Sequence, residues 1–564
     1  MKNWLEKTHG PMFELFRHFL SSFFDTDLVS SPGQIRTALV AAFSVFLPWF
    51  PIFLSPFKNK YAYLSALASP DLYQKAIRAD ELWLITLTMA AIGLLAAIKW
   101  PSMFPGLRDY RSLAALPLRA YQIFSAKLLA LSVVATAVII PLNALPGVLF
   151  PIVTGGKWAY MPSPAGRILA QCVACIAGSY FLFFALVALQ GLLLIILRPG
   201  WFRFVAGYMQ AILVPLMLGM LVLSFSIEPT ITGQVLQPNL ARWLPPVWFL
   251  GLYQSMSGDH DPQMRMLAHR AIVGLLISVV LTLATYIVSY HRHRAILLEG
   301  ATQSGNMWQW VLVMASKLIP QPRRKAIVIF MMKTLAASGQ HRTILTGYIG
   351  FGIAVLLSGL LGIKSVVVPD KVIAASFIYG HVVVMIFLLV GCRHLFAIPV
   401  DLRANWIFRI IESEGRNEWL IAMDGLVLFT GALFILLIPL PFEFKLLGWR
   451  AIAESFLAGI FALVCFEIIF LSWEKLPFTC SHLPGKFPMW IRALQLFALL
   501  TLFPIVNATL LASIYSRTLF FVNLVLFLTT LFFLHTSRMR SRGELHLKFE
   551  ELPEPAVQTL SLLK

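Results

Sequence analysis

Long runs of apolar residues, each about the length of a helix that crosses a lipid bilayer, constrain this chain more than any other feature. The hydrocarbon core of a bilayer is roughly 30 Å thick, which a helix of about 20 residues spans. In lipid the backbone polar groups have no water to bind, so they must be paired within the segment, as in a helix. Runs of this length lie at 36–56, 82–99, 126–150, 167–196, 203–226, 271–290, 344–363, 372–392, 419–440, 451–472, 489–513 and 518–535. The sequence therefore predicts an all-α integral membrane protein with about twelve transmembrane helices.

The composition excludes a water-soluble globular protein. Apolar residues make up 59% of the 564 positions and charged residues only 13%, whereas a soluble domain has roughly 25% charged residues. The basic residues behind the net charge of +19 are spread over the segments between the apolar runs. A nucleic-acid-binding protein would instead gather them on one face, so we expect no nucleic-acid partner.

The positions of lysine and arginine indicate the orientation of the helices, because basic residues gather in cytoplasmic loops. If the N-terminus is cytoplasmic, about two-thirds of the 45 Lys and Arg residues fall on the cytoplasmic side. The first non-cytoplasmic loop, which holds Lys58, Lys60, Lys75 and Arg78, fits this alternation least well. We therefore expect a multi-pass protein with both termini in the cytoplasm.

The densest basic stretch, 291–342, divides the apolar runs into two equal groups. Each group has an even number of runs, so both would enter the membrane in the same direction, as the halves of a parallel repeat do. We expect two six-helix blocks, 1–300 and 301–564, joined by a cytoplasmic linker beside anionic lipid headgroups. Residues 11–24 are too short to cross the bilayer and carry phenylalanine and leucine at helical spacing. This pattern predicts an interfacial helix before the first transmembrane helix.

One apolar segment is too short to cross the bilayer and too apolar for a loop in water. It lies in the long non-cytoplasmic loop at about 227–270 and contains Trp243, Pro245, Pro246, Trp248 and Phe249. Tryptophan favours the headgroup level of a bilayer, and irregular backbone at membrane depth is tolerated where protein buries it. The segment is predicted to be re-entrant or seated at the membrane interface.

Ionisable residues within transmembrane segments are rare and often functional. In the second block Asp424, Glu454, Glu467 and His381 lie within the expected helices, and Glu467 is placed deepest. Two interpretations are open: these side chains line a pathway or join the two blocks, or they form pairs near helix ends. In the first block we expect no charge well inside a transmembrane helix.

The motifs of catalytic and metal sites are missing from the sequence. No G-x-x-x-x-G-K-[ST] loop, H-E-x-x-H helix or G-x-S-x-G turn occurs. Cys172 and Cys175 form a C-x-x-C pair, but no second pair of ligands accompanies it, as a structural zinc site requires. We expect no enzyme, cofactor or metal site in this chain. The segment 475–486, which carries proline, glycine and cysteine, is expected to be a structural turn.

One cytoplasmic loop, 100–124, carries a more informative pattern. A short helical element there would bring basic and apolar side chains to the membrane surface, suited to docking in a groove of a soluble partner. The pattern comprises Asp109-Tyr110-Arg111, Leu113, Leu116-Pro117-Leu118-Arg119 and Ile123-Phe124-Ser125-Ala126-Lys127-Leu128. It resembles the loop between the second and third helices in the permease subunits of type-2 ABC exporters. The segment 245–249 is similar to the external loop before the sixth helix in the same family.

The resemblance implies a coupling helix that contacts a separate cytoplasmic ATPase subunit. In this chain the contact residues would be Arg108, Arg111, Leu116, Pro117 and Arg119. The corresponding loop of the second block, 393–418, contributes Pro399, Arg403 and Arg409 but lacks the alanine-lysine part of the motif. In this interpretation the second block is a diverged copy.

The expected function is an ABC-type transport permease that moves a substrate across the membrane, driven by ATP and Mg²⁺ bound to the partner ATPase. The resemblance also implies a prokaryotic inner membrane. A twelve-helix secondary transporter is an alternative, although half of the chain offers no acid or histidine for a proton relay. A structural or enzymatic subunit of a membrane complex is another. The few charges within the helices favour an apolar or amphipathic cargo.

Overall fold

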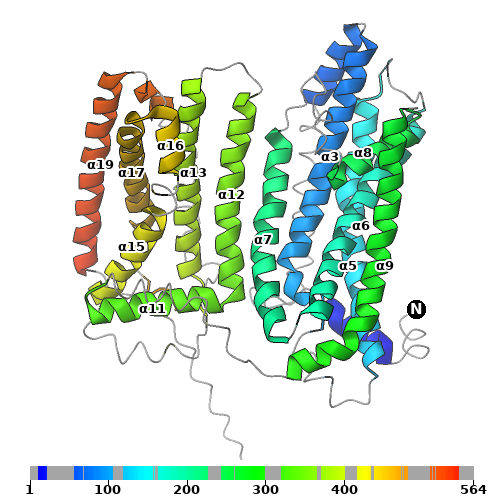
Figure 1. Ribbon diagram of the computed structural model, residues 1–564, viewed down its shortest axis with the longest axis horizontal. Helices are drawn as coiled ribbons and strands as arrows, with labels where there is room; N and C mark the ends of the chain where they lie inside the picture. Colours follow the sequence, from blue (N-terminus) through cyan, green and yellow to red (C-terminus); the bar gives the residue numbers. More distant parts are fainter. Residues whose placement is uncertain are drawn as a thin grey trace, which may run out of the picture. The chain divides into compact units, whose positions relative to one another are not determined.

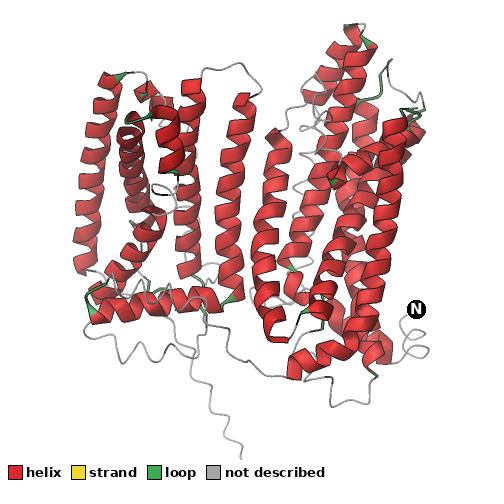
Figure 2. Cartoon of the chain, viewed as in Figure 1, coloured by secondary structure: helices red, strands yellow, loops and turns green. Residues whose placement is uncertain are grey.

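The computed structural model describes most of the long helices of the chain. The described residues form helices joined by turns and contain no β-strand (Figure 2). They are residues 11–21, 56–67, 69–105, 113, 119–156, 158, 163–197, 199–226, 243–259, 261–298, 319–364, 370–400, 405, 416–432, 437, 439–471, 473, 475–479, 508–510, 512–514 and 516–544.

The chain divides into two compact units, Met1–Ser304 and Gly305–Lys564, which are called unit 1 and unit 2 below. The division falls inside the basic stretch 291–342. Each unit has its own hydrophobic core, and each is described by itself.

The long helices of unit 1 run side by side in Figure 1. They are α3 (Pro70–Ile98), α5 (Ala120–Val153), α6 (Pro164–Ile196), α7 (Pro199–Ser226) and α9 (Pro262–Leu298), and the shorter α8 (Pro245–Met256) packs against α3, α6 and α9. Proline marks several of their starts, because the first amide of a helix has no partner within the helix. Ser163 caps α6 by accepting a hydrogen bond from the Gly166 amide at 3.3 Å.

Hydrogen bonds show which helix ends of unit 1 lie together. The Tyr73 hydroxyl donates to the Thr154 carbonyl oxygen at 2.8 Å, so α3 begins beside the end of α5. Gln210, in the first half of α7, donates to the carbonyl oxygens of Ala97 and Ile98 at 3.2 Å. The helices therefore alternate in direction. We call the two ends of this bundle the Pro70 end and the Ile98 end.

Residues 11–21 form a helix on unit 1, as the sequence predicts. Its buried side chains are Leu15 and Phe19, which pack against Leu113 and the first turns of α5. The ammonium group of Lys127 lies over the Phe19 ring, 4.7 Å from its centre, a favourable cation–π contact.

Unit 2 contains α11 (Pro322–Ala337), α12 (Gly339–Lys364), α13 (Asp370–Phe396), α15 (Arg416–Ala432), α16 (Leu440–Leu447), α17 (Arg450–Phe470) and α19 (Arg517–Glu544). In Figure 1 α11 lies across the foot of the other helices. Its buried residues Ile327, Val328 and Met331 join the core. We call the end of unit 2 where α13 ends and α15 begins the Phe396 end, and the end that carries α16 the Leu440 end.

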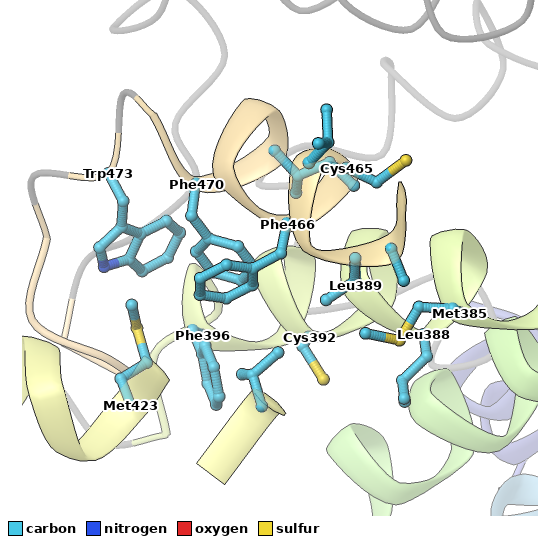
Figure 3. Packing of buried hydrophobic residues seen from close by; sticks show 14 of the residues in the cluster. Met385, Leu388, Leu389, Cys392, Phe396, Met423, Cys465, Phe466, Phe470 and Trp473 are labelled. Carbon is cyan, nitrogen blue, oxygen red and sulfur yellow. The ribbon is translucent and has the colours of Figure 1, made fainter. Parts of the chain in front are cut away.

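The core of unit 2 is formed mainly by α13, α15 and α17. Figure 3 shows Met385, Leu389 and Phe396 of α13 facing Phe466 and Phe470 of α17. Rings dominate the Phe396 end of this core: Phe396 lies 6.4 Å from the Trp473 ring and Phe470 lies 6.0 Å from it. These separations are typical of favourable aromatic pairs.

Eight of the described helices are long and apolar enough to cross a membrane, and they include α3, α5, α6 and α9 in unit 1 and α12, α17 and α19 in unit 2. Their outward faces are apolar: Val280 on α9 is 61% exposed and Phe533 on α19 is 73% exposed. Exposed apolar faces of this extent require a partner such as lipid. The chain is thus a helical multi-pass membrane protein. The expected helix at 36–56 and most of the one at 489–513 lie outside the described residues, so the total of twelve stays a prediction.

Close packing of α12 on α13 leads to a stability prediction. A Cβ atom at Gly352 of α12 would lie 3.0 Å from the Val384 Cα and 3.3 Å from the Phe387 Cβ, whereas a Cβ at Gly359 meets nothing within 4 Å. We expect Gly352→Ala to lower the free energy of unfolding by about 1–3 kcal/mol, because the helices must separate. Gly359→Ala on the same helix is the matched control and should be neutral or slightly stabilising. Thermal unfolding in detergent measures both, and equal effects would contradict the packing argument.

Candidate functional site

The connection between α3 and α5 begins as a buried corner at the Ile98 end. The 3-10 turn η1 (Trp100–Ser102) follows α3 directly, and Trp100, Met103 and Phe104 are almost fully buried. The Tyr286 hydroxyl of α9 donates a hydrogen bond to the Met103 carbonyl oxygen. The rings of Phe104 and Tyr286 stack with centres 4.5 Å apart. The start of the connection is therefore clamped onto α9.

The far side of the same connection is attached to the N-terminal helix and to α5. Leu113 is buried against Leu15 and Phe19 of the helix at residues 11–21. Arg119 is the residue that precedes α5, and its backbone amide donates to the Gln122 side chain at 3.0 Å. The other predicted contact residues, Arg108, Arg111, Leu116 and Pro117, lie outside the described residues.

The corresponding segment of unit 2 is held by the turn at residues 475–479. The Phe478 amide donates to the Phe396 carbonyl oxygen at 2.8 Å, and the Val400 amide, directly after Pro399, donates to the Phe478 carbonyl oxygen at 3.2 Å. Farther along, the Asn405 side chain donates to the Thr479 carbonyl oxygen at 2.7 Å. The described part of the segment 475–486 is thus a turn that holds the loop after α13 in place, and it is called the brace below. Arg403 and Arg409 lie outside the described residues.

The backbone conformation of Phe478 makes the turn at residues 475–479 tight. Its φ angle is +66°, in the left-handed region that non-glycine residues rarely adopt. The surrounding rings hold it there: Phe478 lies 5.4 Å from the rings of both Phe396 and His341 and 6.5 Å from that of Phe330. The sequence carries no signal for this conformation, because it depends on contacts from three separate helices.

The segment predicted to be re-entrant forms α8, whose twelve residues span about 18 Å, less than the bilayer core. It starts at Pro245 and Pro246, exposes Trp243 before it and buries Phe249 completely. Trp248 packs edge-on against Phe181 of α6, with ring centres 5.9 Å apart.

Close backbone contact and a charge pair attach α8 to its neighbours. A Cβ at Gly251 would lie 2.9 Å from the Met264 carbonyl oxygen and 3.0 Å from the Ala268 nitrogen, so α8 lies directly on the α9 backbone. After α8, Asp259 pairs with Arg78 of α3 at 2.5 Å. The element is therefore wedged into unit 1 at the Pro70 end.

The predicted acids Asp424 and Glu467 meet at one arginine that the sequence analysis did not single out. Arg538 of α19 lies 2.7 Å from Asp424 of α15 and 3.1 Å from Glu467 of α17. The His535 ring nitrogen Nδ1 lies 2.9 Å from the other oxygen of Glu467. The guanidinium group also covers the Phe466 ring at 4.7 Å. This network ties three helices together at the Phe396 end.

Glu467 is not deep in its helix, contrary to the sequence-based expectation. α17 ends at Phe470, so Glu467 occupies its last turn. Its partner Arg538 lies near the apolar limit of α19, which ends as a candidate span at Arg540. A charged network at helix ends costs less desolvation than one at the bilayer centre, because long basic side chains reach toward the interface.

The other two predicted polar residues, His381 and Glu454, lie at the Leu440 end. His381 Nε2 of α13 is 3.2 Å from the Glu443 carboxyl of α16, which also accepts a hydrogen bond from Ser455 of α17. Burial raises the pKa of the Glu443 carboxyl, while the hydrogen bond from Ser455 lowers it. Glu454 accepts a hydrogen bond from the Ser513 hydroxyl at 3.0 Å. The four predicted residues therefore form two separate groups.

The expectation that no charge lies well inside a transmembrane helix of the first block is wrong. α3 begins at Pro70, well before the expected start at residue 82, so Asp80 and Glu81 lie on a membrane-spanning helix and are fully buried. The sequence held a usable signal for this start, since Ser69-Pro70-Asp71 is typical of a helix N-terminus.

Within the described part of the chain, no group of three His, Cys, Asp or Glu side chains could hold a metal ion. Cys175 is fully buried and accepts a hydrogen bond from the Gln171 amide at 3.2 Å. Cys172 and Cys175 are both free thiols.

The Arg538 network predicts a specific pattern of destabilisation. Arg538→Gln removes the arginine that pairs with the buried Glu467 carboxylate and the partly buried Asp424 carboxylate, and should lower the free energy of unfolding by about 3–5 kcal/mol. Adding Asp424→Asn and Glu467→Gln should recover much of this loss, because neutral amides need no counter-charge. Thermal unfolding in detergent measures the cycle. Arg540→Gln, an exposed arginine on the same helix, is the control, and an equal effect there would contradict the assignment.

Comparison of the chain with protein-family models, with characterised proteins and with solved structures found no match. The functional conclusion therefore depends on the geometry of the two units.

Proposed function

We propose that the chain is a transport permease of ABC type, energised by a separate cytoplasmic ATPase subunit. In the proposed orientation the Ile98 end and the Phe396 end face the cytoplasm, and α8 lies at the opposite face. The substrate crosses the membrane through rearrangement of the helical units, and this chain contributes no nucleotide site of its own.

The observation that carries the proposal is the attachment of the α3–α5 connection at both of its sides. Tyr286 and Phe104 join its start to α9, and Leu113 joins it to the N-terminal helix and α5. A force applied to this connection by a docked ATPase would reach α3, α5 and α9 together. Coupling elements need this property, because packed elements transmit displacement without absorbing it.

Unit 2 has a comparable arrangement at its Phe396 end. The loop after α13 is braced through Phe478 and Asn405, and Arg538 ties α15, α17 and α19. The basic helix α11 is joined to α15 by the ion pair between Arg324 and Glu418 at 2.5 Å. These contacts support a unit that responds as one body to a partner bound at this end.

A second candidate function is a proton-coupled secondary transporter. Its support is Glu81, an acid buried in a membrane-spanning helix of unit 1. Such an acid marks an ion or proton pathway in many transporters. This observation removes the earlier objection that half of the chain lacks a group for proton exchange.

The proposal predicts that an ATPase subunit co-purifies with the chain and that the α3–α5 connection holds it. We expect Arg108→Glu or Arg111→Glu to release the ATPase, because charge reversal at a docking surface repels a complementary partner. Pull-down of tagged chain from membranes, followed by an ATPase assay, measures this.

Lys58→Glu is the control for these variants, since Lys58 is an exposed lysine that the proposed topology places on the opposite face. It should leave the ATPase bound. Two outcomes would contradict the proposal: transport by purified chain in liposomes without any ATPase, or labelling of cysteines introduced at 106–118 only from the non-cytoplasmic side.

A further inference from the structure

Two consecutive acids of α3 have opposite surroundings. Asp80 and Glu81 are both completely buried. Asp80 has a full set of partners, since Lys60 Nζ lies 2.9 and 2.8 Å from its two oxygens and the Tyr61 hydroxyl donates to it at 2.7 Å. Among the described residues Glu81 forms no ion pair, and its carboxyl oxygens have only the neutral Tyr253 and Gln171 side chains beside them, with no hydrogen bond of normal geometry. The difference in partners, rather than in burial, distinguishes the two acids.

The side chains that face Glu81 come from α6 and α8 and are neutral. They are the Tyr253 hydroxyl of α8, the Gln171 amide of α6 and the Cys175 thiol, one turn farther along α6. The neighbouring charge that acts on Glu81 is Asp80, which is negative as well. The positive side chain on this part of α6, Arg167, acts on Tyr253 and Tyr73. Among the described residues, Glu81 thus has polar neighbours but no counter-charge.

Every other buried acid that the structure describes has a partner. Asp259 pairs with Arg78, and Glu467 pairs with Arg538. Glu443 and Glu454 accept hydrogen bonds from Ser455 and Ser513. Glu81 is therefore the exception within the described part of the chain, and it calls for its own explanation.

A carboxylate in such a place must acquire a positive charge. Burial of an isolated ion in a low-dielectric interior costs many kcal/mol, and the group instead binds a proton or a cation. Hard metal cations take about six or more oxygen ligands. The groups around Glu81 supply a phenol, an amide and a thiol, which is too few oxygen ligands for a metal ion. A protonated carboxyl needs only one acceptor and one donor, which the phenol and the amide can provide.

We infer that Glu81 is a proton-binding site closed by α8. Glu81 holds a proton while α8, which carries Tyr253, is packed against α3 and α6 (Figure 1). When α8 moves away and water reaches Glu81, the carboxyl ionises and its proton passes to that water. Because Glu81 lies about three turns from the start of α3, the exchange takes place with water at the Pro70 end.

The site is tested on full-length protein in lipid nanodiscs. At neutral pH the infrared spectrum of the wild-type protein should contain the carbonyl band of a protonated carboxylic acid in an apolar site. Glu81→Gln, which has the same shape without the acid, should lack this band. Asp80→Asn is the matched control on the adjacent residue and should retain it.

Thermal unfolding as a function of pH gives an independent readout. The folded protein would hold one proton that the unfolded chain releases above about pH 4.3. The stability of the wild-type protein should therefore fall as pH rises above that value, with up to a tenfold loss in the folding equilibrium constant per pH unit. Glu81→Gln should lose this dependence and match or exceed the wild-type stability at pH 8. Asp80→Asn should be less stable at all pH values and keep the wild-type slope.

Two results would overturn the inference. One is a wild-type spectrum without the band that Glu81→Gln removes. The other is stabilisation of the wild-type protein, and not of Glu81→Gln, by sodium, lithium or potassium ions, which would make Glu81 part of a metal-cation site. Neither readout involves the ATPase, so its failure is separate from a failure of the proposed function.

Discussion

The need to compensate every charge inside a nonpolar helical bundle governs how both units are held together. An ion without a partner in such a medium is costly, so each buried charge selects the helix that carries its partner. Arg538 brings α15, α17 and α19 to one point because it neutralises acids from two of them. Lys60 and Arg78 act in the same way at the Pro70 end. Apolar packing fills the space between helices, and the charges determine which ends meet.

The rigid starts of the loops follow from the same need to pair buried polar groups. Backbone carbonyl groups at helix ends have no partner within their helix, and this chain satisfies them with side chains and turns from elsewhere. Tyr286 donates to Met103 after the end of α3, and Phe478 donates to Phe396 at the end of α13. Each of these bonds is accompanied by ring contacts. The loops that leave the Ile98 and Phe396 ends are consequently fixed where they begin, which makes them suitable sites for an external force.

The apolar runs predicted the described helices that are long and apolar enough to cross a bilayer, because length and apolarity alone determine which segments can do so. They also marked out the segment that forms α8, whose apolar run was too short to cross. The sequence did not show which polar residues pair with one another. Asp424 and Glu467 stood out as acids in apolar runs, but Arg538 lay in a segment that reads as an ordinary basic helix end. Which charges meet depends on helix rotation and on contacts between residues far apart in sequence. Glu81 was missed because the apolar run begins after it, while the helix itself begins at Pro70.

Whether a buried charge has a partner distinguishes the rigid regions of the chain from those that can move. At the Phe396 end of unit 2, Arg538 pairs with both acids and lies against the aromatic rings. Displacement of one helix would therefore leave a charge without its partner. At the Pro70 end of unit 1, α8 is attached by Gly251 and Asp259, yet it covers an acid that has no charged partner among the described residues. Lifting α8 would hydrate Glu81 and gain its ionisation free energy, so the cost of opening there is reduced. The proposed transport function needs both kinds of region, a rigid one that receives force and a mobile one that responds to it.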